Sequence, residues 1–249
     1  MEIANLIRRP TQRGYRTSHL SRGEDYHEMF EQNVRRRCLW RIEQQALSEI
    51  IQLCGPKETV RHLDFACGTG RILRHLERFV SRSVGIDVSA SMLNIARRES
   101  PAATLLVGDL TVNPSLLSDQ EFDLITAFRF FPNAEPELRT SSIRALANRL
   151  SPGGCLVFNN HRSTTSIRCR AARCVRGRAD YGMSPQEVSS LTQDAGLVIT
   201  RQFHTGVVPD TEEHPWRPRF LVDSIESIAS RLPVGFLAED VIYVCCREN

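Results

Sequence analysis

The feature that most constrains the fold is a regular alternation of short apolar runs with helical patterns from Val60 onward. The apolar runs have the length of strands, and the patterns between them have the three- and four-residue spacing of helices. The helical patterns centre near Leu73, Leu93, Leu146 and Val188, and the apolar runs lie at residues 60–65, 83–87, 104–107, 123–128, 154–159, 197–203 and 240–246. Strands that alternate with helices form a mostly parallel sheet covered on both faces. The sequence therefore predicts a doubly wound α/β fold whose ligands bind at the carboxyl ends of the strands.

A different pattern precedes this alternation. Residues 1–20 are polar and rich in arginine, and we expect them to be extended. Ser21 and Glu24 form a capping-box pattern, which begins a helix that runs into Arg35–Arg37. A second helical pattern covers residues 39–53, and a Gly-Pro pair ends it. These two helices predict an N-terminal helical cap.

The length of 249 residues suits one large α/β domain with an appendage. We therefore place the helical cap at residues 1–57 and the main domain at residues 58–249. No apolar run approaches the roughly 18 residues of a membrane-spanning helix, and residues 1–15 lack the apolar stretch of a secretory signal. We expect a cytoplasmic protein.

Composition excludes several kinds of partner and mechanism. The net charge of +3 is too small to indicate nucleic-acid binding, so we expect no nucleic-acid partner. Lys57 is the only lysine, which excludes any mechanism that needs two lysines. The eight cysteines form no C-x-x-C pair and no zinc-ligand spacing with histidine, so we expect no metal site. Composition does not determine the oligomeric state.

The first predicted strand ends in a loop of small residues, Asp64–Gly70, that opens the first helix of the alternation. Small residues let the backbone approach a ligand closely, and a helix N-terminus offers free N–H groups. A dinucleotide site would have Gly or Ala three residues after Gly70, but Leu73 stands there. No Gly-Lys-Ser/Thr of a Walker A loop occurs in the chain. The loop predicts a ligand other than a dinucleotide or a nucleoside triphosphate.

An acid follows each of the first three predicted strands: Asp64, Asp87 and Asp109. One acid after a strand is most often a helix N-cap. Three in succession indicate a site, because the carboxyl ends of neighbouring parallel strands meet at one edge of the sheet. Asp87 is placed to accept hydrogen bonds from both hydroxyls of a ribose.

On these residues, and on Phe122–Ile125 and Leu150–Gly154, the chain resembles the class I S-adenosylmethionine-dependent methyltransferases over residues 58–249. The resemblance implies a Rossmann-like, seven-stranded sheet with an antiparallel last strand. It implies S-adenosyl-L-methionine as cofactor and S-adenosyl-L-homocysteine as product. One departure is Ala66, where the family most often has Gly. The cofactor-binding residues that it implies are Asp64, Ala66, Gly68, Gly70, Asp87, Val88, Met92, Asp109, Leu110 and Phe128.

Several acceptor classes of this family do not fit the sequence. Residues 127–133 lack the Asp/Asn-Pro-Pro-aromatic run of DNA amino-methyltransferases, and neither Cys155 nor Cys169 follows the proline that the cytosine C5 enzymes use. The Lys-Asp-Lys-Glu type of RNA methyltransferase needs a second lysine. The Mg²⁺-dependent catechol type needs acids after the fourth and fifth strands, and residues 128–131 and 159–162 have none. None of these acceptor classes fits the sequence. We expect a small-molecule or glycan acceptor, and the glycan is implied by the second resemblance described below.

His161 follows the fifth predicted strand and is our candidate for the catalytic base. An imidazole of ordinary pKa, about 6.5, can accept a proton near neutral pH. The alternative is that His161 caps the following turn. Arg129 interrupts a run of phenylalanines and is expected to face the acceptor, as is Asn160 beside His161. His19 and Tyr26 of the entry segment are further candidates for acceptor contacts.

Residues 162–178 hold six arginines and no acid, with apolar residues at helical spacing. Such a stretch is typical of a solvated helix face. It also fits a basic lid over residues 162–185 that meets an anionic acceptor, or a contact with a membrane surface or glycolipid.

A second resemblance concerns the acceptor. Gly14-Tyr15, residues 17–20, residues 128–133 and residues 159–161 resemble segments of bacterial glycan methyltransferases, among them the nodulation-type enzymes that O-methylate fucose. This resemblance implies O-methylation of a sugar hydroxyl, which a lipid-linked oligosaccharide could carry. N-methylation of a small molecule stays open. So does a protein that binds the cofactor without turnover, as a sensor or assembly partner.

Overall fold

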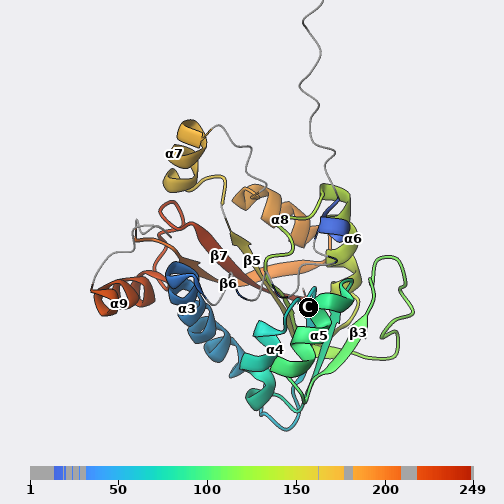
Figure 1. Ribbon diagram of the computed structural model, residues 1–249. Coiled ribbons are helices and arrows are strands. Elements are labelled where there is room, and N and C mark those ends of the chain that lie inside the picture. Colours follow the sequence, from blue (N-terminus) through green and yellow to red (C-terminus); the bar gives the residue numbers. More distant parts are fainter. Residues whose placement is uncertain are drawn as a thin grey trace, which may run out of the picture.

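A computed structural model describes residues 14–18, 20, 24, 28, 32–161, 163–176, 182–208 and 218–247. One seven-stranded sheet lies at the centre, with helices on both faces (Figure 1). The strands are β1 (Arg61–Phe65), β2 (Arg82–Asp87), β3 (Thr104–Val107), β4 (Phe122–Ala127), β5 (Leu150–His161), β6 (Leu197–Thr205) and β7 (Asp240–Arg247). The helices are α1 (Tyr15–Ser18), α3 (Val34–Ile51), α4 (Arg71–Leu76), the 3-10 turn η1 (Glu77–Phe79), α5 (Ala90–Glu99), α6 (Pro136–Ala147), α7 (Ile167–Arg176), α8 (Pro185–Gln193) and α9 (Arg219–Ala229).

The strand order is β3-β2-β1-β4-β5-β7-β6, and β7 runs antiparallel to both of its neighbours. The chain passes from β1 outward through β2 to β3, and then returns to β4 on the other side of β1. The strand order therefore reverses between β1 and β4, which is where ligands bind in open α/β sheets. The predicted Rossmann-like sheet with an antiparallel last strand is confirmed.

Each face of the sheet has its own core. On one face, α6 and α8 pack on alternate residues of β1, β4 and β5, including Leu63, Ile125 and Leu156. On the other face, α3 and α4 pack on the strand residues that alternate with these, including Leu124 of β4 and Val157 of β5. Strands buried on both faces have near-continuous apolar sequences, which explains why they could be located from the sequence.

The N-terminal segment differs from the expectation. Residues 15–18 form the helical turn α1 and are not extended. The cluster Arg35–Arg37 lies in the first turn of α3 and not at the end of an earlier helix, because the side chain of Asn33 accepts a hydrogen bond from the backbone N–H of Arg36 and caps the helix there. The helix α3 belongs to the layer that covers the sheet. The domain boundary at residue 57 stays a prediction.

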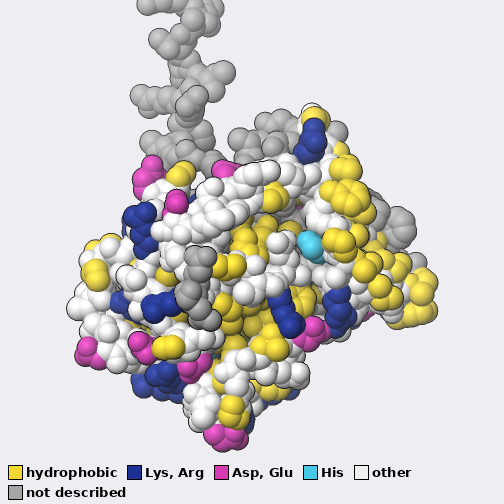
Figure 2. All heavy atoms as spheres, turned by 180° about the vertical axis from the view of Figure 1, so that it is seen from behind, with side chains coloured by type: hydrophobic (Ala, Val, Ile, Leu, Met, Phe, Trp, Pro, Cys, Tyr) yellow, Lys and Arg dark blue, Asp and Glu magenta, His cyan; other side chains and the backbone are white. Residues whose placement is uncertain are grey.

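Two helices lie outside the main alternation. The helix α7 occupies part of the predicted basic stretch, beyond the carboxyl end of β5 (Figure 1). The helix α9 was not predicted, and the apolar side chains on its outer face lie at one side of the molecule (Figure 2): Phe220, Leu221, Ile225 and Ile228. In the described part of the chain, no helix has the length and apolar character to cross a membrane.

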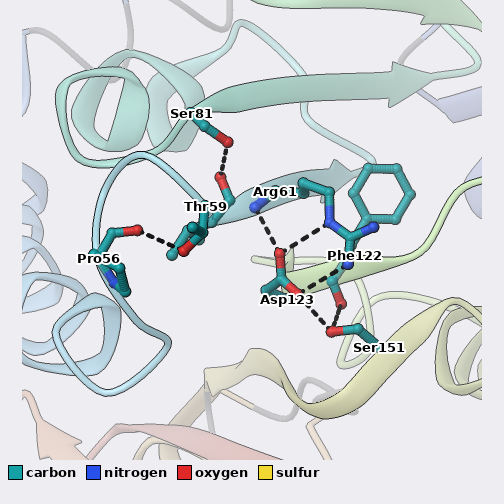
Figure 3. A network of polar contacts seen from close by, with 8 residues as sticks. Pro56, Thr59, Arg61, Ser81, Phe122, Asp123 and Ser151 are labelled. Atoms are coloured by element: carbon teal, nitrogen blue, oxygen red, sulfur yellow. Dashed lines mark hydrogen bonds and ion pairs between the residues drawn. The ribbon is translucent and has the colours of Figure 1, made fainter.

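A polar network joins the amino ends of β1, β4 and β5 (Figure 3). Asp123 accepts hydrogen bonds from the backbone N–H of Arg61 at 2.8 Å, from its guanidinium at 3.1 Å, and from Ser151 Oγ at 2.6 Å. Burial alone would raise the pKa of Asp123, but these hydrogen bonds outweigh it and lower the pKa to about 2. The network fixes three central strands at the edge opposite the expected site.

We expect Asp123→Asn to lower the free energy of unfolding at pH 7 by about 1 kcal/mol, a modest value because the Arg61 side chain is 45% exposed and water screens the pair. Because the folded-state pKa is depressed, the charged form stabilises the protein above pH 4. This stabilisation is lost as the pH falls toward 2. Urea unfolding of the wild type and the variant should therefore differ at pH 7 and converge near pH 2. A constant difference across this range would contradict the assignment, and Asp119→Asn, at an exposed loop position, is the control.

Candidate functional site

A cavity of about 940 Å³ lies at the carboxyl ends of the central strands. Most of the residues predicted to bind ligands line it: Asp64, Ala66, Gly68, Asp87, Val88, Met92, Asp109, Phe128, Arg129 and His161. Three others do not line it: Gly70, Leu110 and Asn160. His19 and Tyr26 lie outside the described residues. The structure thus brings eight of the ten cofactor candidates and the catalytic candidate to one cavity.

The loop after β1 is shaped by left-handed backbone. Gly68 has φ +54° and Gly70 has φ +82°, and a side chain at Gly70 would meet the backbone of α5 at 3.0 Å. Ala66 has φ +55°, which costs energy for a residue with a Cβ. The turn aims the backbone N–H of Gly68 at Asp87 Oδ2, 2.9 Å away. Backbone N–H groups and carboxylates therefore face the same side of the cavity.

Asp64 is 2% exposed and is fixed by a relay of buried polar groups. Thr126 Oγ1 donates to Asp64 Oδ1 at 2.7 Å, and His62 Nε2 lies 2.9 Å from the same hydroxyl. Burial lowers the pKa of His62 to about 3, so the imidazole is neutral and its Nε2–H is assigned as the donor to Thr126. Sequence reasoning missed both His62 and Thr126, since each reads as part of a strand.

The second carboxylate oxygen of Asp64 is buried and has no hydrogen-bond partner among the described residues. Burial raises the pKa of this carboxyl to about 7, and the hydrogen bond from Thr126 offsets the effect only in part. A buried acid with an oxygen free of protein partners, at the wall of a cavity, is suited to a cationic ligand.

The other two acids are also held by the protein. Asp87 accepts from the backbone N–H groups of Gly68 and Ser89, the latter at 2.8 Å. Asp109 accepts from Thr111 and from Arg16 Nε, which lies 2.6 Å from Asp109 Oδ2. Burial opposes the ionisation of Asp109, but these hydrogen bonds and the Arg16 charge lower its pKa. Asp109 is therefore ionised at neutral pH.

The helix α1 lines the cavity through two neighbouring residues, Tyr15 and Arg16. Arg16 contacts Asp109, whereas Tyr15 packs its ring edge on Phe130 with centroids 5.3 Å apart. The Tyr15 hydroxyl donates to the backbone carbonyl of Arg129 at 3.3 Å. Tyr15 and Arg16, which sequence reasoning did not name as site residues, thus form part of the cavity wall.

The inner wall of the cavity is organised by Asn159. Its Oδ1 accepts from the backbone N–H of Arg129 at 2.5 Å, and its Nδ2 donates to Asp240 Oδ2 at 2.8 Å. Arg129 has φ +60°, so this hydrogen bond supports a backbone conformation that is costly for a residue with a side chain. Asp240 is 4% exposed, and its Oδ1 has no hydrogen-bond partner in the described part of the chain.

Two assignments change as a result. The side chain of Asn160 makes two hydrogen bonds to the backbone of Met183 and does not line the cavity. Its neighbour Asn159 does not line the cavity either, but it holds Arg129 and Asp240, which do. Leu110 is fully buried in the main core, and only its neighbour Asp109 lines the cavity. Asp240 was missed altogether. Its position depends on the pairing of β5 with β7, which places it opposite His161.

A buried acid, Glu43 of α3, lies behind this wall. It is 1% exposed, accepts from Arg71 at 2.5 Å, and has its other oxygen 3.9 Å from the Arg129 guanidinium. Burial and the charge of Glu43 raise the pKa of Asp240, while Arg129 opposes them. Arg71 also lies over the ring of Trp40, 4.1 Å from its centroid. The helix α3 is therefore part of the site.

Comparisons with known proteins agree with this geometry. Residues 63–154 match the family model of a methyltransferase domain. The chain is 36% identical, over 96 residues, to dTDP-3-amino-3,6-dideoxy-alpha-D-glucopyranose N,N-dimethyltransferase of Streptomyces fradiae, a match that covers 39% of this chain and 32% of the relative. It is 28% identical over 160 residues to the ubiquinone biosynthesis O-methyltransferase of Ralstonia nicotianae, covering 59% of this chain and 66% of the relative. The matches thus span about a third to two thirds of these relatives.

The fold has a close counterpart among solved structures. Magnesium protoporphyrin IX methyltransferase from Synechocystis PCC 6803, solved with bound SAH, superposes with a TM-score of 0.67 at 15% identity. The superposition covers 94% of this chain and 98% of that protein. The fold is therefore that of the class I S-adenosylmethionine-dependent methyltransferases, and residues 63–154 are similar to a methyltransferase domain.

Proposed function

We propose that the protein is an S-adenosylmethionine-dependent methyltransferase that acts on a small-molecule acceptor. The observation that carries this proposal is one cavity lined by two different sets of residues. One set is the loop after β1 with the acids Asp64, Asp87 and Asp109, and the other is Arg129, His161 and Asp240. Its volume of about 940 Å³ is at the upper end of ligand pockets, which leaves space for a cofactor and a small acceptor together.

The residues present fit the cofactor. Asp87 would accept hydrogen bonds from the ribose hydroxyls, and the unpartnered oxygen of Asp64 would meet the ammonium group. The turn at Gly68 lets the backbone approach, and Met92 and Asp109 border the place expected for adenine. When bound, S-adenosylmethionine supplies an activated methyl group and leaves as S-adenosylhomocysteine.

The inner wall would position the acceptor and accept its proton. Methyl transfer requires an in-line approach of the nucleophile, so the fixed backbone of Arg129 and the side chains beside it contribute mainly by orientation. His161 remains our candidate for the base, and Asp240 lies opposite it in the β5–β7 pair.

We propose that the acceptor is a sugar or a similar polar small molecule that reacts at a hydroxyl or amino group. The resemblance of short segments to glycan O-methyltransferases favours a sugar hydroxyl. The names of the relatives include both an amino-sugar N,N-dimethyltransferase and a ubiquinone O-methyltransferase, which supports both kinds of nucleophile. A lipid-linked acceptor and a lid role for residues 162–185 stay predictions.

The test is incubation of the purified chain with methyl-labelled cofactor and a panel of sugars, amino sugars, glycolipids, phenols and amines, followed by mass analysis of the products. We expect label in a sugar hydroxyl or amine. If S-adenosylhomocysteine binds and no acceptor is labelled, the proposed acceptor class is wrong. If S-adenosylhomocysteine fails to bind, the methyltransferase proposal itself is wrong.

We expect Asp87→Ala to weaken binding of S-adenosylhomocysteine by about 1.5–3 kcal/mol, because the ribose hydroxyls lose a charged acceptor. Isothermal calorimetry measures the change. Asp119→Ala removes an acid from an exposed loop and should bind like the wild type. Equal affinities in the two variants would remove Asp87 from the site.

Asp64→Asn should have opposite effects on stability and binding. The folded-state pKa of Asp64 is raised to about 7, so the ligand-free protein loses stability as the pH rises from 4 to 7, where the unfolded chain is already ionised. The amide of the variant does not ionise, so the variant keeps its stability over this pH range and should be more stable than the wild type at pH 8. Its affinity for S-adenosylhomocysteine should fall. Thermal unfolding and calorimetry measure the two effects. A variant less stable at pH 8 would contradict the stability half of the prediction.

His161→Ala should lower kcat by roughly 10²- to 10⁴-fold with an acceptor found in the panel, and leave the affinity for S-adenosylhomocysteine unchanged. Asp240→Asn keeps the shape but removes the charge, so we expect a smaller loss of about tenfold. Steady-state kinetics from pH 6 to 9 measures both. Wild-type kcat in His161→Ala over this range would show that another group, or none, takes the proton.

A further inference from the structure

A row of arginines lines the part of the cavity between α3 and α4, which no step above uses. The two helices pack against each other, and the residues that face the space between them come from one face of each helix. We call this space the arginine groove and define it by Arg36, Arg37 and Arg41 of α3, Arg71 and Arg74 of α4, and Arg78 of the following turn η1. It is continuous with the cavity that holds the proposed cofactor and acceptor ends.

Acidic side chains balance only part of this charge. Arg71 pairs with Glu43, Arg74 with Glu99, and Arg41 with Asp223 of α9, each at 2.5 Å. Neither Arg37 nor Arg78 takes part in an ion pair with any residue that the structure describes. Among the residues that the structure describes, the groove therefore carries more positive than negative charge.

We propose that the arginine groove binds a phosphate or diphosphate group of the methyl acceptor while the reacting group lies at the inner wall beside Arg129. The proposal rests on the proposed function and adds the substrate class. Guanidinium groups present planar pairs of donors that match phosphate oxygens, and several of them converge here. Because the arginines line a recess between two helices, a small ligand fits them better than a flat membrane or a nucleic-acid duplex.

The groove is joined to the reacting end through Glu43. This carboxylate binds Arg71, which lines the groove, and lies 3.9 Å from Arg129, which lines the inner wall. Between them the ring of Trp40, already covered on one side by Arg71, gives an apolar surface to the uncharged part of an acceptor. A molecule with an anion at one end and a hydroxyl or amine at the other could span both.

The test uses calorimetric titration of the full chain with inorganic pyrophosphate and with a nucleoside diphosphate, each with and without S-adenosylhomocysteine. The variant Arg37→Gln/Arg78→Gln removes two charges that hold no ion pair in the described structure. We expect it to weaken binding of both probes about tenfold or more, most strongly at low salt, and to leave S-adenosylhomocysteine affinity unchanged. The control Arg97→Gln/Arg144→Gln removes two exposed arginines outside the cavity and should match the wild type.

Three outcomes overturn the proposal. Equal loss of affinity in both double variants would mean that the anions respond only to net charge. Displacement of pyrophosphate by S-adenosylhomocysteine would mean that the groove serves the cofactor. Binding of pyrophosphate but not of the nucleoside diphosphate would mean that the groove accepts only a free anion. The groove could then not bind the phosphate of a larger methyl acceptor. If S-adenosylhomocysteine fails to bind the wild type while pyrophosphate binding still depends on Arg37 and Arg78, the proposed function is wrong and the anion site stands.

Discussion

The site depends on one hydrogen bond across the point where the strand order reverses, from Thr126 Oγ1 in β4 to Asp64 in β1. Burying a carboxylate is costly unless polar groups surround it. Thr126 and, behind it, His62 supply those groups to one oxygen only. The other oxygen has no hydrogen-bond partner among the described residues and could accept one from a ligand. The hydrogen bond from Thr126 thus lowers the cost of burying the carboxylate and also fixes the direction of its second oxygen.

A second device of the same kind shapes the opposite end of the cavity. The side-chain amide of Asn159 makes two hydrogen bonds. Its oxygen accepts from the left-handed backbone of Arg129, and its nitrogen donates to the buried carboxylate of Asp240. Both devices use a neutral side chain on a central strand to fix an acid at the strand's end.

The sheet and the cofactor end could be predicted because their signals are local. Each buried strand is a short apolar run, and Asp64, Asp87 and Asp109 each follow such a run directly. The inner wall could not be predicted, because it depends on contacts between distant segments: Asn159 and Asp240 are 81 residues apart. Side chains alternate between the faces of a strand, so Asn159 and Asn160 could be told apart only once the register was known. The role of α1 was hidden for the same reason, since Arg16 and Asp109 are 93 residues apart.

The position of α1 has a thermodynamic consequence. This short helix contacts Asp109 through Arg16 at one end of the cavity, and the carbonyl of Arg129 through Tyr15 at the other. A ligand that displaces or tightens α1 at either end changes the free energy of occupying the other end by the same amount in both directions. Ligands that both change the position of α1 would therefore have coupled binding free energies, and the coupling would pass through a single turn of helix.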